Sequence, residues 1–453
     1  MKVCKFGGSS LADASQVAQV CDVVTADPER RLVVVSAPGK RHKEDIKVTD
    51  LLIACANARL DGKSTDEALE AVVARYREIQ ETLGVDATVI ESISENLSTT
   101  LAGNTEHRER FMDAMKAAGE DNSARLVAAE LQRRGETARY QNPGDAGLLL
   151  SDEYGNARLL PESYDNLARL REAEGITVFP GFFGYTREGE VVTFPRGGSD
   201  ITGSILAAAV KADLYENFTD VDSVCSIDPD LAPNVQPITE ITYREMRELS
   251  YAGFGVLHDE AIIPAVHAGI PIRIANTNRP DLPGTLIMSE REVTHGTVVG
   301  IAASSGFCTV FASKYLMNRE VGFGRRFLQF FEEEGLSFEH MPSGVDNISI
   351  ILREDELDEA TVERIVTHVR DELGADSVNV EHGLALVMLV GEGMHYTVGV
   401  ARRATAALAD ANVNIEMINQ GSSEISIMFG VKESDRTVAM QALYREFFLS
   451  SGR

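Results

Sequence analysis

Three short segments carry hydroxyl or charged side chains, two of them together with paired glycines, and each stands where a predicted strand meets a loop or helix. They are Lys5-Phe6-Gly7-Gly8-Ser9-Ser10, Arg196-Gly197-Gly198-Ser199-Asp200 and Phe218-Thr219-Asp220-Val221-Asp222. Glycine lets the backbone approach a ligand closely, and free N–H groups at a helix N-terminus suit a phosphate. Lysine adds a point charge, and arginine presents a planar fork that matches a carboxylate. Each segment alone is compatible with an ordinary turn or helix cap, but the three together favour a nucleotide site.

The elements that must position these segments lie in the first two thirds of the chain. Residues 1–292 alternate short β-branched runs with longer amphipathic patterns, which is typical of a layered α/β domain with a mostly parallel sheet. Strands are predicted at 3–6, 32–36, 177–179, 214–217 and 272–275, and helices at 13–25, 65–83, 123–134, 201–210 and 243–252. Ligands of such sheets bind at the carboxyl ends of the strands, so we expect the three segments to meet in one cleft.

The last third of the chain contains an internal repeat. Val321 aligns with Val398 at an offset of 77 residues, and nine of the thirty positions from there to Ile350 and Ile427 are identical. Each copy shows the pattern strand, helix, strand, strand, helix, as a ferredoxin-like βαββαβ unit requires. The second copy ends too soon for a sixth strand, so we expect residues 298–302 to supply it. Chance similarity between two amphipathic segments is the alternative.

The composition limits the partners of this protein. Its 43 Lys and Arg residues face 70 Asp and Glu residues, which gives a net charge of −27. Nucleic-acid binding needs basic side chains that neutralise phosphates, so no nucleic-acid partner is expected. No apolar run has the length of a signal peptide or membrane span, which predicts a cytoplasmic protein without a membrane partner. The five cysteines are scattered, so neither a disulfide framework nor a protein metal site is expected.

Five motifs, together with the repeat, carry a resemblance to a known family. They are KFGGSS, FPRGGSD, FTDVDSV, LHDEAIIPA and NQGSSEISI, in this order and spacing. The chain resembles the aspartate kinases over nearly its whole length. The resemblance implies an α/β fold, namely an amino-acid-kinase three-layer sandwich with a mainly parallel sheet, followed by two ferredoxin-like ACT units. The implied domains are 1–292 (catalytic), 293–383 (first ACT region, with strand 298–302 donated to the second unit) and 384–453 (second ACT unit).

The resemblance implies an activity and its regulation. Such enzymes transfer the γ-phosphoryl group of ATP, with Mg²⁺, to the side-chain carboxylate of L-aspartate. The product, 4-phospho-L-aspartate, leads to lysine, threonine, methionine and diaminopimelate. Feedback by lysine or threonine at the ACT units and a homodimer joined through them are also implied. Two alternatives stay open: another amino-acid kinase, acting on glutamate, acetylglutamate, carbamate or UMP, and a catalytically silent amino-acid sensor.

The resemblance also implies roles for individual residues. The predicted catalytic residues are Lys5, which stabilises charge on the transferring phosphoryl group, and Asp200, which orients the reacting groups. The predicted aspartate-binding residues are Thr49, Glu120 (for the ammonium), Phe182, Arg196 (for the α-carboxylate) and Ser199. The predicted ATP-binding residues are Lys5, Gly7, Gly8, Ser9, Thr219 and Asp220. The predicted effector-binding residues, in a loop at 317–324 and a strand at 336–343, are Met317, Gly322, Phe323, Glu339 and Ser343. Without the family, Glu120 is an acidic residue at a helix start, where it would interact with the helix dipole.

The chain departs from the family pattern at two positions. Many members have a lysine shortly before the Val-Leu-His motif, and Gly255 stands there in this chain. A common arginine near Asp228-Pro229 is replaced by Asp230. Both changes remove positive charge from the nucleotide side. Our hypothesis is that the basic loop 38–47, with Lys40, Arg41, Lys43 and Lys47, supplies a replacement cation; an exposed charged loop without that role is the alternative.

Overall fold

The chain divides into two compact units. The computed structural model describes residues 1–195, 197–255, 259–291, 297–421 and 425–449. Unit 1 contains Met1–Val224, Pro237–Met246 and Gly255–Arg291, and unit 2 contains Cys225–Gln236, Arg247–Phe254 and Glu292–Arg453. Two stretches before residue 292 thus pack with the C-terminal unit, and the expected domain boundaries stay a prediction.

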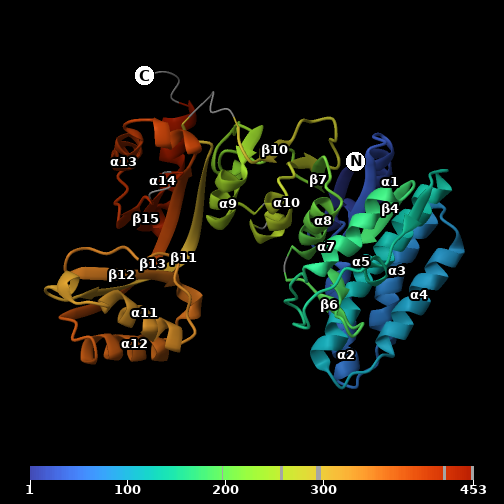
Figure 1. Ribbon diagram of the computed structural model, residues 1–453, viewed down its shortest axis with the longest axis horizontal. Helices are drawn as coiled ribbons and strands as arrows, with labels where there is room; N and C mark the ends of the chain where they lie inside the picture. Colours follow the sequence, from blue (N-terminus) through green and yellow to red (C-terminus); the bar gives the residue numbers. More distant parts are fainter. Residues whose placement is uncertain (196, 256–258, 292–296, 422–424, 450–453) are drawn as a thin grey trace. The chain divides into compact units, whose positions relative to one another are not determined.

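Unit 1 is built on an eight-stranded sheet (Figure 1). Its strands are β1 (Lys2–Phe6), β2 (Arg30–Val35), β3 (Ala138–Tyr140), β4 (Ile176–Pro180), β7 (Leu214–Thr219), β8 (Glu240–Thr242), β9 (Ile272–Asn276) and β10 (Thr285–Met288). The order across the sheet is β3-β4-β2-β1-β7-β9-β10-β8, and every pair is parallel except β9 with β10. The five strands and the mainly parallel sheet predicted from sequence are therefore confirmed. The additional strands have only three or four residues, too few to show a periodic pattern.

Helices cover both faces of this sheet. They are α1 (Ala14–Thr25), α2 (Val48–Leu60), α3 (Asp66–Leu83), α4 (Ala87–Leu101), α5 (Arg108–Arg133), α6 (Pro143–Ala146), α7 (Glu162–Ala168), α8 (Gly198–Ala209), α9 (Tyr243–Tyr251, which ends in unit 2) and α10 (Ile263–His267). Cys4 and Phe6 of β1 share a core with α1–α5. Side chains alternate along a strand, so Lys5 faces the other side, where α8 packs on β1 and β7 and contacts α7 and α10. A small hairpin, β5 (Phe183–Tyr185) and β6 (Val191–Thr193), joins β4 to α8.

Helix α5 corrects one prediction. The sequence pattern placed a helix at 123–134 with Glu120 at its start, but α5 begins at Arg108 and Glu120 lies in its middle. The pattern failed because α5 is buried nearly all round and carries polar residues on buried positions, among them Asn122 and Ser123. A helix surrounded by protein lacks the apolar stripe that marks a surface helix. Glu120 therefore has no helix terminus beside it, and the helix-dipole explanation does not apply.

Unit 2 is built on a five-stranded antiparallel sheet in the order β12-β11-β13-β15-β14. Its strands are β11 (Gly300–Ser313), β12 (Asn347–Arg353), β13 (Ser377–Val390), β14 (Met417–Asn419) and β15 (Ser426–Lys432), and its helices are α11 (Phe323–Glu333), α12 (Glu359–Asp371), α13 (Val400–Asp410) and α14 (Arg436–Tyr444). The strand expected at 336–343 is wrong, since only isolated bridges, His340 to Ile351 and Ser343 to Ile348, form there.

The two repeats share β11 and β13 (Figure 1). Residues 300–304 pair with 386–390, and residues 307–313 pair with the part of β13 from 384 back to 377. One core contains residues of α13 and α14, and a second contains residues of α11 and α12. Residues 300–304 thus lie beside the strand of the second repeat, which is the arrangement that a donated strand produces.

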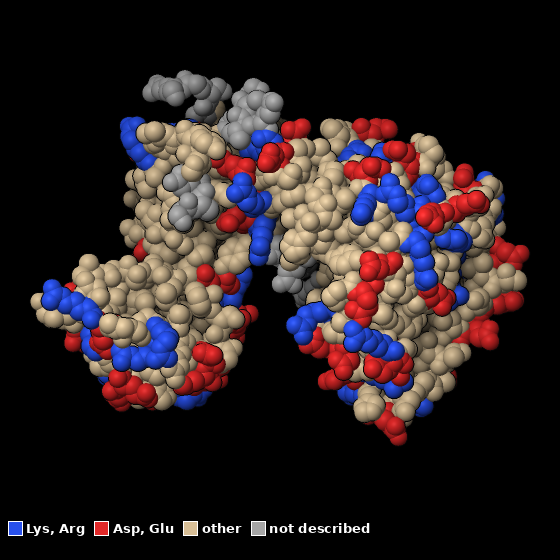
Figure 2. Space-filling view, in the orientation of Figure 1, with Lys and Arg blue, Asp and Glu red and all other residues tan. Residues whose placement is uncertain are grey.

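Acidic and basic side chains are interspersed over the visible face of the molecule. Figure 2 shows Lys and Arg among Asp and Glu, with no continuous basic surface among the coloured residues on this face. None of the five cysteines, all of which lie in the described ranges, forms a disulfide. In the described ranges, no helix is both long enough and apolar enough to cross a membrane.

Candidate active site

The loops after five parallel strands meet at one edge of the unit 1 sheet. The carboxyl ends of β1, β2, β4, β7 and β9 lie at this edge because the strands run in the same direction. Backbone hydrogen bonds join the loops in series: Gly39 N donates to Gly8 O at 2.8 Å, and Gly7 N to Phe218 O at 3.3 Å. Thr277 N donates to Thr219 O at 2.9 Å. The loops therefore form one continuous surface of backbone groups.

Gly8 and Gly39 are required where the first two loops touch. A Cβ on Gly39 would lie 2.6 Å from the carbonyl carbon of Gly8, and a Cβ on Gly8 would lie 2.9 Å from the carbonyl oxygen of Ala37. Such contacts are too short for real carbon atoms, so backbone meets backbone here only because both residues are glycine. The β1 loop then continues as a short 3₁₀ turn, Gly8–Leu11, with the Ser9 side chain exposed. The prediction that the Gly7-Gly8 segment forms a close-approach loop is consistent with this geometry.

Lys5, Asp200 and Asn217 form a closed triangle of contacts beneath these loops. Lys5 Nζ lies 2.6 Å from Asp200 Oδ1, with the two side chains 10% and 18% exposed. Asn217 Nδ2 donates to the same Asp200 oxygen at 2.8 Å, and Lys5 Nζ donates to Asn217 Oδ1 at 3.4 Å. The two predicted catalytic residues are therefore in direct contact, although 195 positions separate them.

Phe182 and Ser199 pack together beside this triangle. A Cβ on Gly181 would lie 2.7 Å from Ser199 Cβ, and a Cβ on Gly198 would lie 2.6 Å from the Phe182 ring. Phe182 has φ 74°, an unfavourable value for a residue with a side chain, and its N–H donates to Thr202 Oγ1 at 3.0 Å. Such strain persists only where the surroundings hold it, and it is common at functional sites. Two predicted aspartate-binding residues thus lie on the α8 side of the strand ends.

Glu120 is a buried carboxylate whose two oxygens differ in their hydrogen bonding within the described residues. It is 5% exposed, and its Oε1 accepts a hydrogen bond from Ala37 N at 3.0 Å. Its Oε2 is buried and has no hydrogen-bond partner among the described residues. Burial raises the pKa of Glu120 to about 8. Gly119 allows this approach, since a Cβ there would lie 2.9 Å from Ala37 Cβ. A buried carboxylate of this kind is suited to receive a cation.

Helix α5 also fixes the strand that leads to the second glycine segment. Asp113 is 1% exposed, and its Oδ2 accepts hydrogen bonds from Gly155 N at 2.7 Å and Thr193 N at 2.9 Å. Thr193 ends β6, three residues before Arg196. Arg196 itself lies outside the described residues, so its predicted contact with an α-carboxylate stays a prediction.

The predicted adenosine side is held by side-chain hydrogen bonds. Thr219 Oγ1 donates to Asp220 Oδ1 at 3.1 Å, and Asn276 Nδ2 donates to the Asp220 carbonyl at 3.3 Å. Ser10 and Thr277 share a hydrogen bond of 2.7 Å between their hydroxyl groups. These contacts tie the ends of β7 and β9 to the β1 loop.

Thr49 and the basic loop lie after β2. Thr49 is the second residue of α2 and is half-buried. Arg41 pairs with Asp45 at 2.9 Å and with Glu78 at 2.7 Å, and its hydrogen bond holds the pKa of Asp45 well below its usual range. Arg41 is therefore already neutralised, whereas the exposed Lys40 directly follows Gly39, with Nζ 3.4 Å from a main-chain oxygen of Lys43.

The predicted effector residues differ in their surroundings. Met317 and Phe323 are buried in the core of the first repeat, while Gly322, with φ 80°, and Ser343 are exposed. Glu339 lies 3.4 Å from Arg353 and accepts a hydrogen bond from the Tyr251 hydroxyl of α9.

The cluster around Glu339 continues to a neighbouring histidine. The Tyr251 ring meets His340 edge to face at 6.1 Å, and Asn419 Nδ2 lies 3.1 Å from His340 Nδ1. Burial lowers the pKa of His340. The predicted effector region is therefore connected to the end of α9 within unit 2.

Sequence reasoning missed Asn217 as a site residue, as well as Ala37, Asn276 and Thr277. Ala37, Asn276 and Thr277 lie at or just after a strand end, so a survey of every strand end would have found them. Asn217 lies inside β7 and has no local signal in the sequence.

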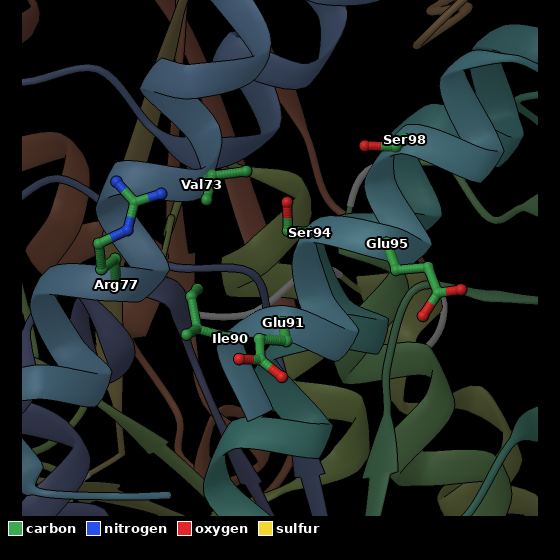
Figure 3. Close-up of a pocket in the computed structure, with 7 residues that line it drawn as sticks. All are labelled: Val73, Arg77, Ile90, Glu91, Ser94, Glu95 and Ser98. Atoms are coloured by element: carbon green, nitrogen blue, oxygen red, sulfur yellow. The ribbon is translucent and has the colours of Figure 1, made fainter. Parts of the chain in front are cut away.

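A separate groove lies between α3 and α4 (Figure 3). Its volume is about 530 Å³, and its lining residues are Val73, Arg77, Ile90, Glu91, Ser94, Glu95 and Ser98. None of the predicted site residues lines it, so it has no part in the candidate active site.

Comparisons with known proteins agree with the geometry. Residues 1–276 match the amino acid kinase family, and residues 387–447 match the ACT domain. Aspartokinase 3 of Bacillus subtilis (strain 168) is 57% identical over 448 residues, covering 99% of both chains. The crystal structure of Clostridium acetobutylicum aspartate kinase is similar with a TM-score of 0.87 and 38% identity, covering 99% of this chain and 100% of that one.

A third relative has been solved in two complexes. Escherichia coli aspartokinase III with aspartate and ADP (R-state) gives a TM-score of 0.78 at 25% identity, covering 99% of this chain and 100% of that one. The same enzyme with lysine and aspartate (T-state) gives 0.77 at 26% identity, covering 99% of both chains. The structure has a buried Lys5–Asp200 pair where the strands end, and the Bacillus subtilis aspartokinase is 57% identical over 99% of both chains. The chain therefore belongs to the aspartate kinase family.

Proposed function

We propose that this protein transfers the γ-phosphoryl group of ATP to the side-chain carboxylate of L-aspartate. Two observations carry the proposal: a buried cation, Lys5, lies at the end of β1, and a buried carboxylate, Glu120, lies beside the loop after β2 with an oxygen that has no hydrogen-bond partner among the described residues. Each group suits one substrate: the cation suits a phosphate, and the carboxylate suits an ammonium group.

The aspartate side is formed by α5, α2 and the β4–α8 region. Glu120 binds the substrate ammonium with its free Oε2, and Arg196 binds the α-carboxylate through its planar fork. Thr49 and Ser199 line the pocket, and Phe182 packs against the substrate. These assignments favour aspartate over acceptors without an amino group, such as carbamate. With such an acceptor bound, Glu120 would be a buried carboxylate without a cation to pair with.

The ATP side is formed by the loops after β1 and β7. The N–H groups of Gly7, Gly8 and Ser9 donate to phosphate oxygens, as expected of a strand–loop–helix segment. Thr219 and Asp220 border the adenosine. Lys40, which follows Gly39, is one of the exposed lysines of the basic loop that would serve as an additional cation.

The chemistry is electrostatic. A carboxylate and a triphosphate repel each other, so cations and aligned N–H groups must hold them in line. Lys5 stabilises the negative charge that spreads over the transferring phosphoryl group. Asp200 holds Lys5 in position at 2.6 Å and orients the reacting groups. A carboxylate is already deprotonated at neutral pH, so the acceptor needs no general base.

We propose that Mg²⁺ enters with ATP. Across the part of the chain that the structure describes, no group of three or more His, Cys, Asp and Glu residues could hold a metal ion. Mg²⁺ usually keeps several waters and binds one or two carboxylates plus substrate phosphates. The carboxylates available at the strand ends are Asp200 and Asp220. When bound, the ion would neutralise part of the negative charge of the phosphates.

Feedback control is proposed at the first repeat. The relative with lysine bound supports lysine as the effector, with threonine as the second candidate. Residues 317–324 together with Glu339 and Ser343 form the proposed effector region. An effector there changes activity only if it binds one of two states of the protein more tightly. Glu339 contacts Tyr251 of α9, so effector binding can reach α9 through this pair.

We also propose a homodimer through the ACT units. Val321 and Val398, at equivalent positions of the two repeats, are 97% and 101% exposed, and Tyr396 is 80% exposed. Fully exposed apolar side chains that recur at equivalent positions favour a protein–protein contact.

The decisive experiment is an acceptor survey with the purified protein. ATP, Mg²⁺ and hydroxylamine are supplied with L-aspartate, L-glutamate or N-acetylglutamate, and acyl hydroxamate is measured. We expect product with L-aspartate and inhibition by added lysine or threonine. Product with another acceptor alone would contradict the proposal. No product with any acceptor, but binding of lysine or threonine, would indicate the silent sensor instead.

A further inference from the structure

We propose that Asn217 is a positioning residue for phosphoryl transfer, a role that rests on the proposed function. It holds the Lys5 ammonium and the Asp200 carboxylate in a fixed relation, so that Lys5 keeps one N–H free for the phosphoryl group. Asn217 belongs to none of the three glycine or charge clusters of the sequence. Its place in the sheet is what connects it to both residues.

The sheet register places Asn217 next to Lys5. The two residues are paired neighbours on the parallel strands β7 and β1, so their side chains leave the sheet on the same face. That face is covered by α8, which carries Asp200 in its first turn. Asn217 is 3% exposed, and both polar atoms of its amide have a partner in the triangle.

The chemistry of the amide matches this position. Its NH₂ group donates a hydrogen bond to the Asp200 carboxylate, and its oxygen accepts one from the Lys5 ammonium group. One amide group therefore forms a hydrogen bond with each of the two charged side chains. The flipped amide would place oxygen against carboxylate and NH₂ against ammonium, and both contacts would be repulsive. Only asparagine and glutamine carry a side-chain amide, in which the donor and the acceptor are separate atoms in one plane. The longer glutamine would push Lys5 and Asp200 apart.

The triangle has a consequence for Lys5. An ammonium group has three N–H donors. One N–H is directed to Asp200 at 2.6 Å and one to Asn217 at 3.4 Å. These two contacts together fix the direction of the third N–H bond. Without Asn217, Lys5 would keep its ion pair but could rotate about it. The loss would affect the transition state more than substrate binding, since a displacement of about 1 Å can cost about a hundredfold in rate.

The experiment compares three variants with the wild type and one matched control. Asn217→Ala removes both contacts, and Asn217→Ser keeps a hydrogen-bond donor and acceptor on a shorter side chain. Asn217→Asp keeps the size and shape of the side chain but places a second negative charge beside Asp200. Thr177→Val is the control, because Thr177 is buried in β4 and no described residue forms a hydrogen bond with its hydroxyl. The kcat and the KM for each substrate are measured by hydroxamate formation, and folding is monitored by thermal melting.

We expect Asn217→Ala to lower kcat by about 10- to 100-fold while the KM for aspartate and for ATP changes less than about threefold. Asn217→Asp should be at least as impaired, Asn217→Ser intermediate, and Thr177→Val within about twofold of wild type. If Asn217→Asp does not fold, the alanine and serine variants decide. A kcat within about twofold of wild type in Asn217→Ala, or a change confined to KM, overturns the proposal. Absence of aspartate-dependent product in the wild type defeats the proposed function instead.

Discussion

The main-chain N–H of Ala37 donates to Glu120 Oε1 at 3.0 Å, and Oε2 is a buried carboxylate oxygen with no hydrogen-bond partner in the part of the chain that the structure describes. The pair links the loop after β2 to the middle of α5. It fixes the carboxyl group in place before any substrate arrives.

This relationship predicts a pH dependence of aspartate binding. The pKa of Glu120 is about 8 in the free protein, so at pH 6 the group is mostly protonated and cannot pair with an ammonium. We expect kcat/KM for aspartate to rise with pH up to about 8 and then to level. Glu120→Gln should lower kcat/KM by about 100-fold or more, since a buried charged hydrogen bond is lost, and should flatten the profile. A wild-type profile that is flat between pH 6 and 8 would contradict the prediction.

The same shift predicts a pH dependence of stability. The folded-state pKa of about 8 lies above the ordinary value of 4.5, so between these pH values the folded protein binds a proton that the unfolded chain has released. The free energy of unfolding therefore falls as the pH rises through this window. Urea unfolding at pH 5, 6.5 and 8 should show this decline in wild type and a smaller decline in Glu120→Gln. Equal slopes for the two proteins would argue against a raised pKa.

Lys5→Met should remove most of the activity. The substitution deletes the cation and leaves Asp200 without its ion-pair partner. We expect a fall in kcat of about 100-fold or more, equivalent to about 3 kcal/mol, with ATP still bound by the loop N–H groups. Steady-state kinetics and an ATP-binding titration separate the two effects. Loss of ATP binding with an unchanged kcat at saturation would assign Lys5 to affinity rather than to the reaction.

Gly255→Lys should tighten ATP binding. No described residue lies within 4 Å of a Cβ built at Gly255, so a side chain there displaces none of them. A lysine there restores the cation that many relatives carry near the phosphates, and we expect the KM for ATP to fall about threefold or more. Gly255→Gln supplies similar bulk without charge and serves as the control. Equal KM values for the two variants would show that the charge at this position has no effect.

Tyr251→Phe should weaken feedback control. The variant removes the hydrogen bond to Glu339 and keeps the ring against His340. We expect the concentration of lysine or threonine that halves activity to rise about fivefold, the effect of about 1 kcal/mol of lost coupling. Activity without effector should stay near wild type, and Tyr164→Phe in unit 1 is the matched control. An unchanged inhibition curve would exclude this pair from the regulatory connection.

The sequence predicted the sheet of unit 1 well because its central strands are buried on both faces. Such strands are short, continuous apolar runs followed by glycine or polar residues, as at Leu32–Val35. The edge strands and the β5–β6 hairpin have three or four residues, and contacts far along the chain decide their conformation. The start of α5 was missed for a related reason, since a fully buried helix shows no stripe.

The site was predicted in part. The segments with glycine and charge identified Lys5 and Asp200, and the structure brings these two together. Asn217 escaped because a lone asparagine inside a strand has no local signal, and its role depends on the register between β1 and β7. The free oxygen of Glu120 likewise depends on how closely Gly119 lets α5 approach the β2 loop.

The strands β11 and β13, which run through both repeats, impose an order on the folding of the nascent chain. Residues 300–304 leave the ribosome more than 80 positions before residues 386–390, with which they pair. At about 5–20 residues per second, several seconds pass between the two events. During that time the helices α11 and α12 can already close over their half of the sheet, while the other half of β11 waits for the nascent chain to be completed. A fragment that begins after β11 would lack residues 300–304, the strand segment that pairs with residues 386–390.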